Sequence, residues 1–177
     1  MQFPFLFRLA ALALCAATVS ACSLVFNWRE VLIADDGLVA LLPCKADRAT
    51  RTLPLGGETI TVDMTGCEAG GATFAIAHAA ASSADQAEAW MHAWRAATRS
   101  QLANATVAEA PAVLPRASAM PAPVRLDAQG ADRASTMHVV WFAQQRAGRM
   151  ALYQATVVGE PSQPEALTTF IEGLRLP

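Results

Sequence analysis

The sequence has few of the residues that catalysis and metal binding usually need. Among its 177 residues are three histidines, and charged residues make up 16% of the chain. The sequence has no His-x-x-x-His spacing, and no histidine is next to a glutamate. The Gly-x-Ser-x-Gly elbow of serine hydrolases is absent, and Gly56-Gly57 and Gly70-Gly71 lack the glycine spacing or following lysine of a phosphate-binding loop. We therefore expect no catalytic residue, no cofactor and no metal.

Clustered basic charge is absent as well. The formal net charge is -2, and the two signs are interspersed along the chain. The sequence has no basic stripe with interleaved aromatic residues, which is the usual pattern of a nucleic-acid interface. Arg146 and Arg149 are expected to be solvated residues beside a turn. We therefore expect no nucleic-acid partner.

The histidines still define an alternative function. His78, His92 and His138 could each serve as a general base or a metal ligand. Two of them together with a carboxylate in one cleft would favour an enzyme or a metal protein, whereas chance distribution is the simpler interpretation. The paired carboxylates Asp35-Asp36 lie in a predicted turn, where solvation or turn hydrogen bonding explains them.

The start of the chain resembles the export signal of bacterial lipoproteins. Arg8 precedes an apolar stretch from Leu9 to Val19, and the residues Val19-Ser20-Ala21 stand directly before Cys22. These last four residues form a lipobox. The resemblance implies cleavage before Cys22, attachment of a diacylglyceryl group to its thiol, and acylation of its new amine by a chain such as palmitate. Several acyl chains would make the membrane attachment permanent.

The same resemblance predicts location and boundaries. Ser23 is not the aspartate that retains such proteins at the inner membrane, so we expect the inner leaflet of the outer membrane, facing the periplasm. The expected parts are a signal peptide over residues 1–21, a short tether over 22–28 and a single domain over 29–177. Two alternatives remain: an ordinary secretory cleavage site that releases a soluble protein, and an uncleaved anchor from Leu9 to Phe26.

Cysteine usage agrees with an oxidising compartment. Of the four cysteines, Cys15 leaves with the predicted signal and Cys22 carries the lipid, so Cys44 and Cys67 remain. We expect these two to form a disulfide, because such bonds persist outside the cytoplasm. A redox or metal-binding pair is the alternative. The wide spacing, unlike Cys-x-x-Cys, and the lack of a histidine at ligand spacing count against it.

Alternating apolar residues and turn residues predict mostly strands. Residues 30–33 and 38–42 bracket the predicted turn Asp35–Gly37, and Gly56-Gly57 is expected to join two strands of a hairpin. The remaining predicted strands are 72–78, 124–126, 136–144 and 150–158, of which the last three would form an antiparallel meander. The alanine- and proline-rich segment 105–123 is expected to be a long surface connection or an ordered excursion that carries function.

Two helices are predicted from capping residues and helical spacing. Ser83 with Gln86, and later Ser162 with Glu165, are capping-box patterns. The first helix carries an apolar stripe that includes Trp90 and Trp94, and the second carries Leu167, Phe170 and Ile171. An aromatic stripe at helical period usually packs in a core, although it could line a ligand groove.

These elements predict an α+β fold, an antiparallel sheet covered by one long and one short helix. Their order is similar to the PsbP-like fold, whose members include an extrinsic photosystem subunit and a Ran-binding nuclear transport factor. The chain also resembles small bacterial lipoproteins with the same cysteine pair. The similar stretches are 37–43, 68–77, 150–159 and 170–176. The resemblance implies a role in binding other proteins and carries over no catalytic residue.

Three classes of function follow. We expect a non-enzymatic, membrane-anchored envelope lipoprotein that binds a protein partner or acts as a scaffold. The first alternative is a binder of a small apolar or lipidic ligand, in a cavity between sheet and helix. The residues expected to line that cavity, or a partner surface, are Trp90, Trp94 and Trp141 together with Phe74. The second alternative is the histidine-based enzyme or metal protein.

Overall fold

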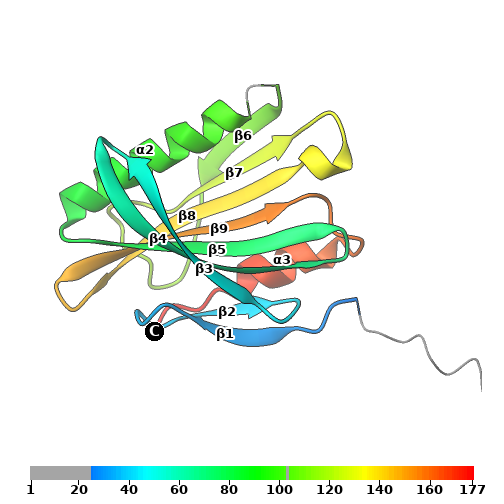
Figure 1. Cartoon of the computed structure of the whole chain (residues 1–177), viewed down its shortest axis with the longest axis horizontal. Helices are drawn as coiled ribbons and strands as arrows, with labels where there is room; N and C mark the ends of the chain where they lie inside the picture. The colour runs from blue at the N-terminus through cyan, green and yellow to red at the C-terminus, as the bar shows by residue number, and fades with distance from the viewer. Residues whose placement is uncertain (1–24, 103) are drawn as a thin grey trace, which may run out of the picture.

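The computed structural model describes residues 25–102 and 104–177, in which one twisted sheet carries a layer on each face (Figure 1). Its seven strands lie in the order β3-β4-β5-β9-β8-β7-β6, and all neighbours are antiparallel. The predicted α+β class is confirmed. The lipobox and Cys22 lie outside the described residues. In the described part of the chain, no helix is long and apolar enough to cross a membrane.

The elements follow the predicted order, and most strands are longer than expected. The strands are β1 (Arg29–Ile33), β2 (Leu38–Leu42), β3 (Asp47–Leu55), β4 (Glu58–Ala69), β5 (Ala72–Ala81), β6 (Thr106–Pro111), β7 (Val124–Gln129), β8 (Met137–Arg146) and β9 (Arg149–Val158). The helices are α2 (Ala84–Gln101), α3 (Glu165–Glu172) and the short 3-10 turn η1 (Arg133–Ser135). β1 and β2 pair with each other as a separate hairpin.

One prediction was wrong in part. Thr106–Pro111 forms β6, an edge strand paired with β7, although the segment 105–123 was predicted as a surface connection. Proline is tolerated on an edge strand because no neighbour needs its missing N–H. The strand was not predicted because its alanine and proline content is typical of a loop, although an edge strand tolerates this composition.

The β3–β4 turn confirms the predicted hairpin. Gly56 and Gly57 have φ angles of 62° and 84°. Two successive positive φ angles define the type I′ turn, which favours glycine and matches the twist of the strands it joins. Leu55 is paired with Glu58 across this turn, and the register continues without a break to Asp47 opposite Gly66.

Strand alternation divides the interior into two apolar cores. One lies between the sheet and α2 and contains Trp90, Met91, Trp94, Leu126, Trp141 and Leu152. The other lies between the sheet, α3 and the β1–β2 hairpin and contains Ile33, Leu38, Phe74, Phe142, Tyr153 and Phe170. The sheet is thus covered on both faces, by α2 on one and by α3 with the hairpin on the other.

The two helix starts differ from each other. Ser83 caps α2, and its side chain accepts a hydrogen bond from the Gln86 N–H, as predicted. The predicted cap at Ser162 is wrong. The Ser162 N–H instead donates to the Gly70 carbonyl at 2.7 Å, and α3 begins after Pro164 without a side-chain cap. Ser162 therefore anchors the chain to the β4–β5 turn.

The predicted disulfide is confirmed. Cys44 and Cys67 are bonded, with 2.02 Å between the sulfurs and a sequence separation of 23. Cys44 follows β2 and Cys67 lies within β4. The bond therefore ties the β1–β2 hairpin to the main sheet.

Candidate functional site

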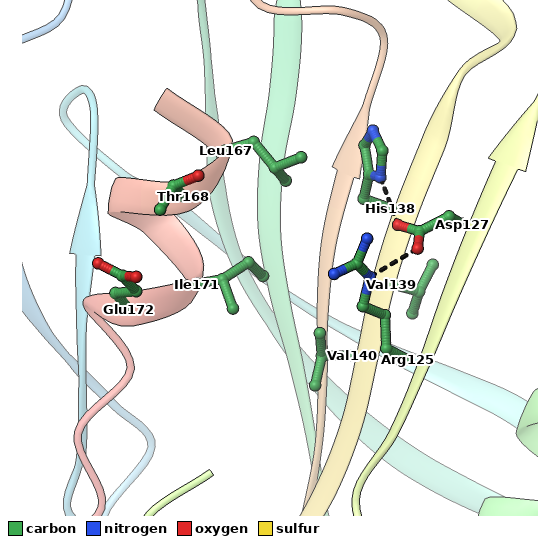
Figure 2. Close-up of a pocket in the computed structure, with 9 residues that line it drawn as sticks. All are labelled: Arg125, Asp127, His138, Val139, Val140, Leu167, Thr168, Ile171 and Glu172. Carbon is green, nitrogen blue, oxygen red and sulfur yellow. Dashed lines mark hydrogen bonds and ion pairs between the residues drawn. The ribbon is translucent and has the colours of Figure 1, made fainter. Parts of the chain in front are cut away.

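A groove between α3 and the strands β7 and β8 is the candidate site (Figure 2). Its volume is about 290 Å³, and it opens to solvent. The sheet side contributes polar side chains and the helix side contributes apolar ones. The residues used below are Arg125, Asp127, His138, Val140, Leu167, Thr168 and Ile171.

The polar wall is built by the pairing of β7 with β8. Asp127 lies directly opposite His138 in the antiparallel register, so their side chains share one face of the sheet. The two Asp127 oxygens hold two different groups: His138 Nδ1 lies 2.6 Å from Oδ1, and Arg125 Nε donates to Oδ2 at 2.6 Å. Since an ionised carboxylate only accepts, this contact places the proton on His138 Nδ1.

This arrangement leaves hydrogen-bond donors available. Arg125 bonds Asp127 through Nε, and no other bond of its guanidinium is found among the described residues, while its side chain is 57% exposed. A guanidinium presents its donors in a planar fork that suits a carboxylate. The polar wall can therefore bind an acceptor group from a ligand without first breaking the bond to Asp127.

The opposite wall is apolar. Leu167 and Ile171 are four residues apart on α3, so they lie on one side of the helix, and Figure 2 shows both pointing toward the sheet. Both are half-buried and pack against the core beneath the helix, and Val140 on the sheet is buried. The groove thus has an apolar side and a polar side within reach of one ligand.

The structure keeps the three histidines apart. His78 and His138 lie on the same face of the sheet, but His78 is opposite Tyr153 and His138 is opposite Val157. Four residues along a strand span about 13 Å. His92 is exposed on α2, across the sheet. In residues 25–102 and 104–177, no group of three or more histidine, cysteine, aspartate or glutamate side chains could hold a metal ion.

His78 belongs to a closed polar site that the sequence analysis missed. Its Nε2 lies 2.6 Å from Asp36 Oδ2, whereas Asp36 was expected to be explained by solvation or turn bonding. Burial, and next the charge of Asp36, raise the pKa of the neighbouring Tyr153 far above its ordinary value. Within the described chain, His78 Nδ1, Gln144 Oε1 and Tyr153 OH are buried without a hydrogen-bond partner. A histidine in an otherwise apolar strand was the one available signal.

The three tryptophans singled out from the sequence lie in the core under α2. Trp141 is 0% exposed, and Trp90 and Trp94 are each 8% exposed. Trp141 Nε1 donates to Gln154 and Trp90 Nε1 donates to Glu58, both at 3.0 Å. Phe74 belongs to the core on the other face of the sheet. The expected ligand cavity is therefore occupied by packed side chains, and these residues form no exposed surface.

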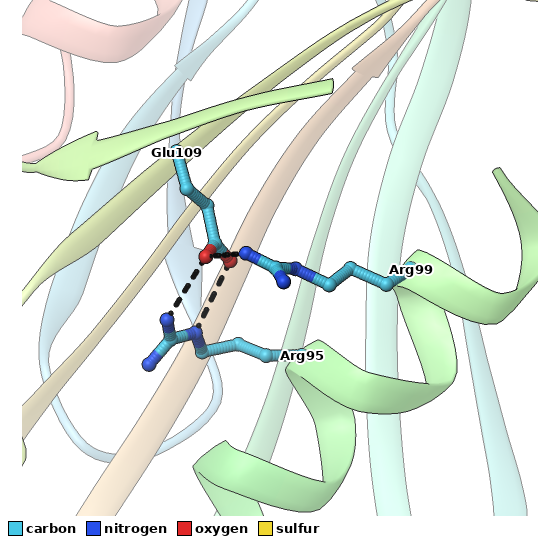
Figure 3. Close-up of polar contacts among 3 residues, drawn as sticks. All are labelled: Arg95, Arg99 and Glu109. Carbon is cyan, nitrogen blue, oxygen red and sulfur yellow. Dashed lines mark hydrogen bonds and ion pairs between the residues drawn. The ribbon is translucent and has the colours of Figure 1, made fainter. Parts of the chain in front are cut away.

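A second polar contact joins α2 to the edge strand β6 (Figure 3). Arg95 and Arg99 lie one helical turn apart, and both bond the carboxylate of Glu109. Burial raises the pKa of Glu109, but the hydrogen bonds and charges of the two arginines outweigh burial and hold it below its ordinary value. This contact fastens the end of the helix to the sheet, and we assign it a structural role.

No family model matches the chain, and no curated protein matches it. A function for this chain is therefore inferred from the groove and from the sequence features described above.

Proposed function

We propose that this protein is an envelope lipoprotein whose domain binds a protein partner through the groove between α3 and β7–β8. Cys22 carries the lipid, and the domain faces the periplasm from the inner leaflet of the outer membrane. The lipobox and Ser23 support this location. The Asn27 N–H already donates to the Pro43 carbonyl, five residues after Cys22, so the fold begins close to the anchor.

The two unlike walls of the groove carry the proposal. An apolar side chain of a partner would pack on Leu167 and Ile171, while a neighbouring carboxylate would bind Arg125. Because α2 covers one face of the sheet and α3 with the β1–β2 hairpin covers the other, a partner cannot reach the sheet itself in those regions. The groove, which is open and has hydrogen-bond donors, is the surface that we expect a partner to bind. Because the anchor confines the domain near its partners, a weak contact at this groove would suffice.

The fold itself supports a binding role by analogy. We infer that the domain is PsbP-like, since its order of strands, a long helix, further strands and a short helix is similar to the order in that fold. Members of that group act mainly by binding proteins. The proposed activity is accordingly non-enzymatic and uses no cofactor.

Site-specific photocrosslinking in intact cells tests the groove. A photoreactive residue at Thr168, which lines the groove and is exposed, should capture a defined protein. Adding Ile171→Glu or Arg125→Glu should remove that product, because each changes one wall. The control is the same photoreactive residue at Met120, which is 67% exposed and outside the groove. Equal capture at Met120, or capture unchanged by both variants, would contradict the proposal.

The anchor has its own test. Cys22→Ser should abolish labelling of the protein by radioactive palmitate and release it from the membrane fraction. Cys15→Ser is the control, because it leaves the predicted lipidated cysteine in place. Labelling that persists in Cys22→Ser would overturn the anchor and leave the groove proposal standing.

A further inference from the structure

β3 is a long edge strand with an open side. It pairs with β4, and in the described chain it pairs with no other strand. Eight of its nine residues are exposed. An exposed edge of this length offers unpaired backbone groups to another strand.

The register of the hairpin shows which backbone groups are free. Leu55 and Glu58 flank a two-residue type I′ turn, and such residues exchange backbone hydrogen bonds. Because an antiparallel strand alternates the direction of its N–H and C=O groups, the odd-numbered residues of β3 bond β4. The N–H and C=O groups of Arg48, Thr50 and Thr52 therefore point outward.

We propose that β3 pairs with β3 of a second copy of this chain, antiparallel about a two-fold axis at Ala49. In this register Arg48 lies opposite Thr50 of the second copy, and these residues exchange backbone hydrogen bonds. Ala49 lies opposite Ala49 of the second copy, where two small side chains allow close approach. Asp47 lies directly opposite Arg51 of the second copy, and the symmetry creates this ion pair twice.

Charge complementarity selects the register. The side chains of Asp47 and Arg51 are both exposed, and neither bonds another group among the described residues. A two-fold axis at Arg51 would place two arginines opposite each other, and opposed like charges are destabilising. An axis at Thr52 would bring Pro54, which has no N–H, into the ladder. An axis at Thr50 would leave both charges opposite uncharged residues.

The dimer would be closed and would leave the groove free. A two-fold contact uses the same patch on both copies, so it ends with two chains instead of growing into a fibre. β3 lies at one edge of the sheet, whereas β7 lies near the other. Two grooves per dimer could thus act on a partner together.

Disulfide trapping in the full-length, membrane-bound protein tests the register. The Cβ atoms of directly opposed residues lie about 4.5–5.5 Å apart, so Ala49→Cys should form a covalent dimer on mild oxidation. Thr52→Cys is the control, because Thr52 is also exposed and lies on the same strand. In the dimer the two side chains at position 52 would be six positions apart, about 20 Å, so this variant should form no covalent crosslink. No dimer from Ala49→Cys, or equal dimer from both variants, would overturn the proposal.

Charge exchange gives a second, reversible test. In the Ala49→Cys background, Arg51→Asp should lower the crosslinked fraction about ten-fold, since two attractive pairs become repulsive. Adding Asp47→Arg should restore crosslinking because the pairs re-form with exchanged signs. Sedimentation of the wild-type protein in detergent should also show a dimer. A wild-type monomer, or a dimer that persists in both Arg51→Asp and Thr50→Pro, would overturn the assignment.

Discussion

Two aspartate–histidine pairs on one face of the sheet differ in their surroundings. In each pair a histidine nitrogen lies 2.6 Å from an aspartate oxygen. The His78 side chain is 7% exposed beneath the β1–β2 hairpin, whereas that of His138 is 24% exposed in the open groove. The same contact therefore joins the β1–β2 hairpin to the sheet in one case and lines an open groove in the other. The two pairs differ in the burial of the histidine and not in the length of the contact.

The closed end depends first on the disulfide. Replacing Cys44 and Cys67 together by alanine should lower the free energy of unfolding by about 3 kcal/mol, because the open chain gains conformational freedom in the unfolded state. Urea unfolding with and without reductant measures the loss. Crosslinking from Thr168 should be unchanged, since the groove lies on other elements. A variant as stable as the wild type would show that the hairpin is held by its packing alone.

The two pairs can next be compared directly. Asp36→Ala should cost about 1–3 kcal/mol, because it leaves the buried His78 without its partner. Asp127→Ala should cost less than about 1 kcal/mol, because its partners remain solvated. Urea unfolding of both variants at neutral pH measures the difference.

A double variant checks the cause of that difference. Asp36→Ala with His78→Phe should recover part of the loss seen in Asp36→Ala, since no buried polar ring then remains unpaired. Equal costs for the two single variants would contradict the contrast between the closed and open ends.

Alkaline pH should affect the closed end selectively. Tyr153 is the single tyrosine of the chain, and burial followed by the charge of Asp36 raises its pKa. An unfolded tyrosine ionises near pH 10, so above that pH the unfolded state holds fewer protons than the folded state. Stability should therefore fall by about 1.4 kcal/mol for each further pH unit. Tyr153→Phe should lack this part of the slope.

Near-ultraviolet absorbance gives the matching measurement. Tyrosinate should be absent while the protein is folded and should appear together with unfolding. Ionisation near pH 10 in the folded protein would contradict the closed environment of Tyr153.

The smallest change in stability is expected from substitution of Glu109. Its contact with Arg95 and Arg99 has partly exposed partners and can be compared with the two aspartate–histidine pairs. Its lowered pKa means that the contact with Arg95 and Arg99 stabilises the fold above the ordinary glutamate pKa, and that this contribution is lost as the pH falls through the lowered value. Glu109→Gln should therefore reduce stability slightly at neutral pH and have no effect in acid. A difference that persists in acid would assign the loss to packing.

The sequence was informative where structure is local. Gly56-Gly57, the helix start at Ser83 and the strand 38–42 follow from neighbouring residues, and all agree with the structure. The Cys44–Cys67 bond was predicted because the export signal indicates an oxidising compartment and because the other two cysteines were assigned to the signal and to the lipid. β6 was missed because its proline is harmless on an edge. The cap predicted at Ser162 was wrong because the Ser162 N–H bonds the distant Gly70 carbonyl and α3 begins after Pro164.

The sites depend on pairings that sequence patterns do not give. Asp36 and His78 are 42 residues apart, and only the docking of the hairpin brings them together. Asp127 and His138 meet through the β7–β8 register, which a prediction of individual strands does not fix. Alternation places Phe74 and Ile76 on one face of β5, but it does not say which face α2 covers. The grouping of Phe74 with the tryptophans failed for that reason.

The division of the interior also separates the aromatic chromophores. Trp90, Trp94 and Trp141 lie on the α2 side of the sheet, while Tyr153 and Trp28 pack on the α3 side. Tryptophan emission therefore reports mainly on one half of the protein, and tyrosine absorbance reports on the other. A stopped-flow experiment that records both signals could establish whether the two halves assemble at the same rate.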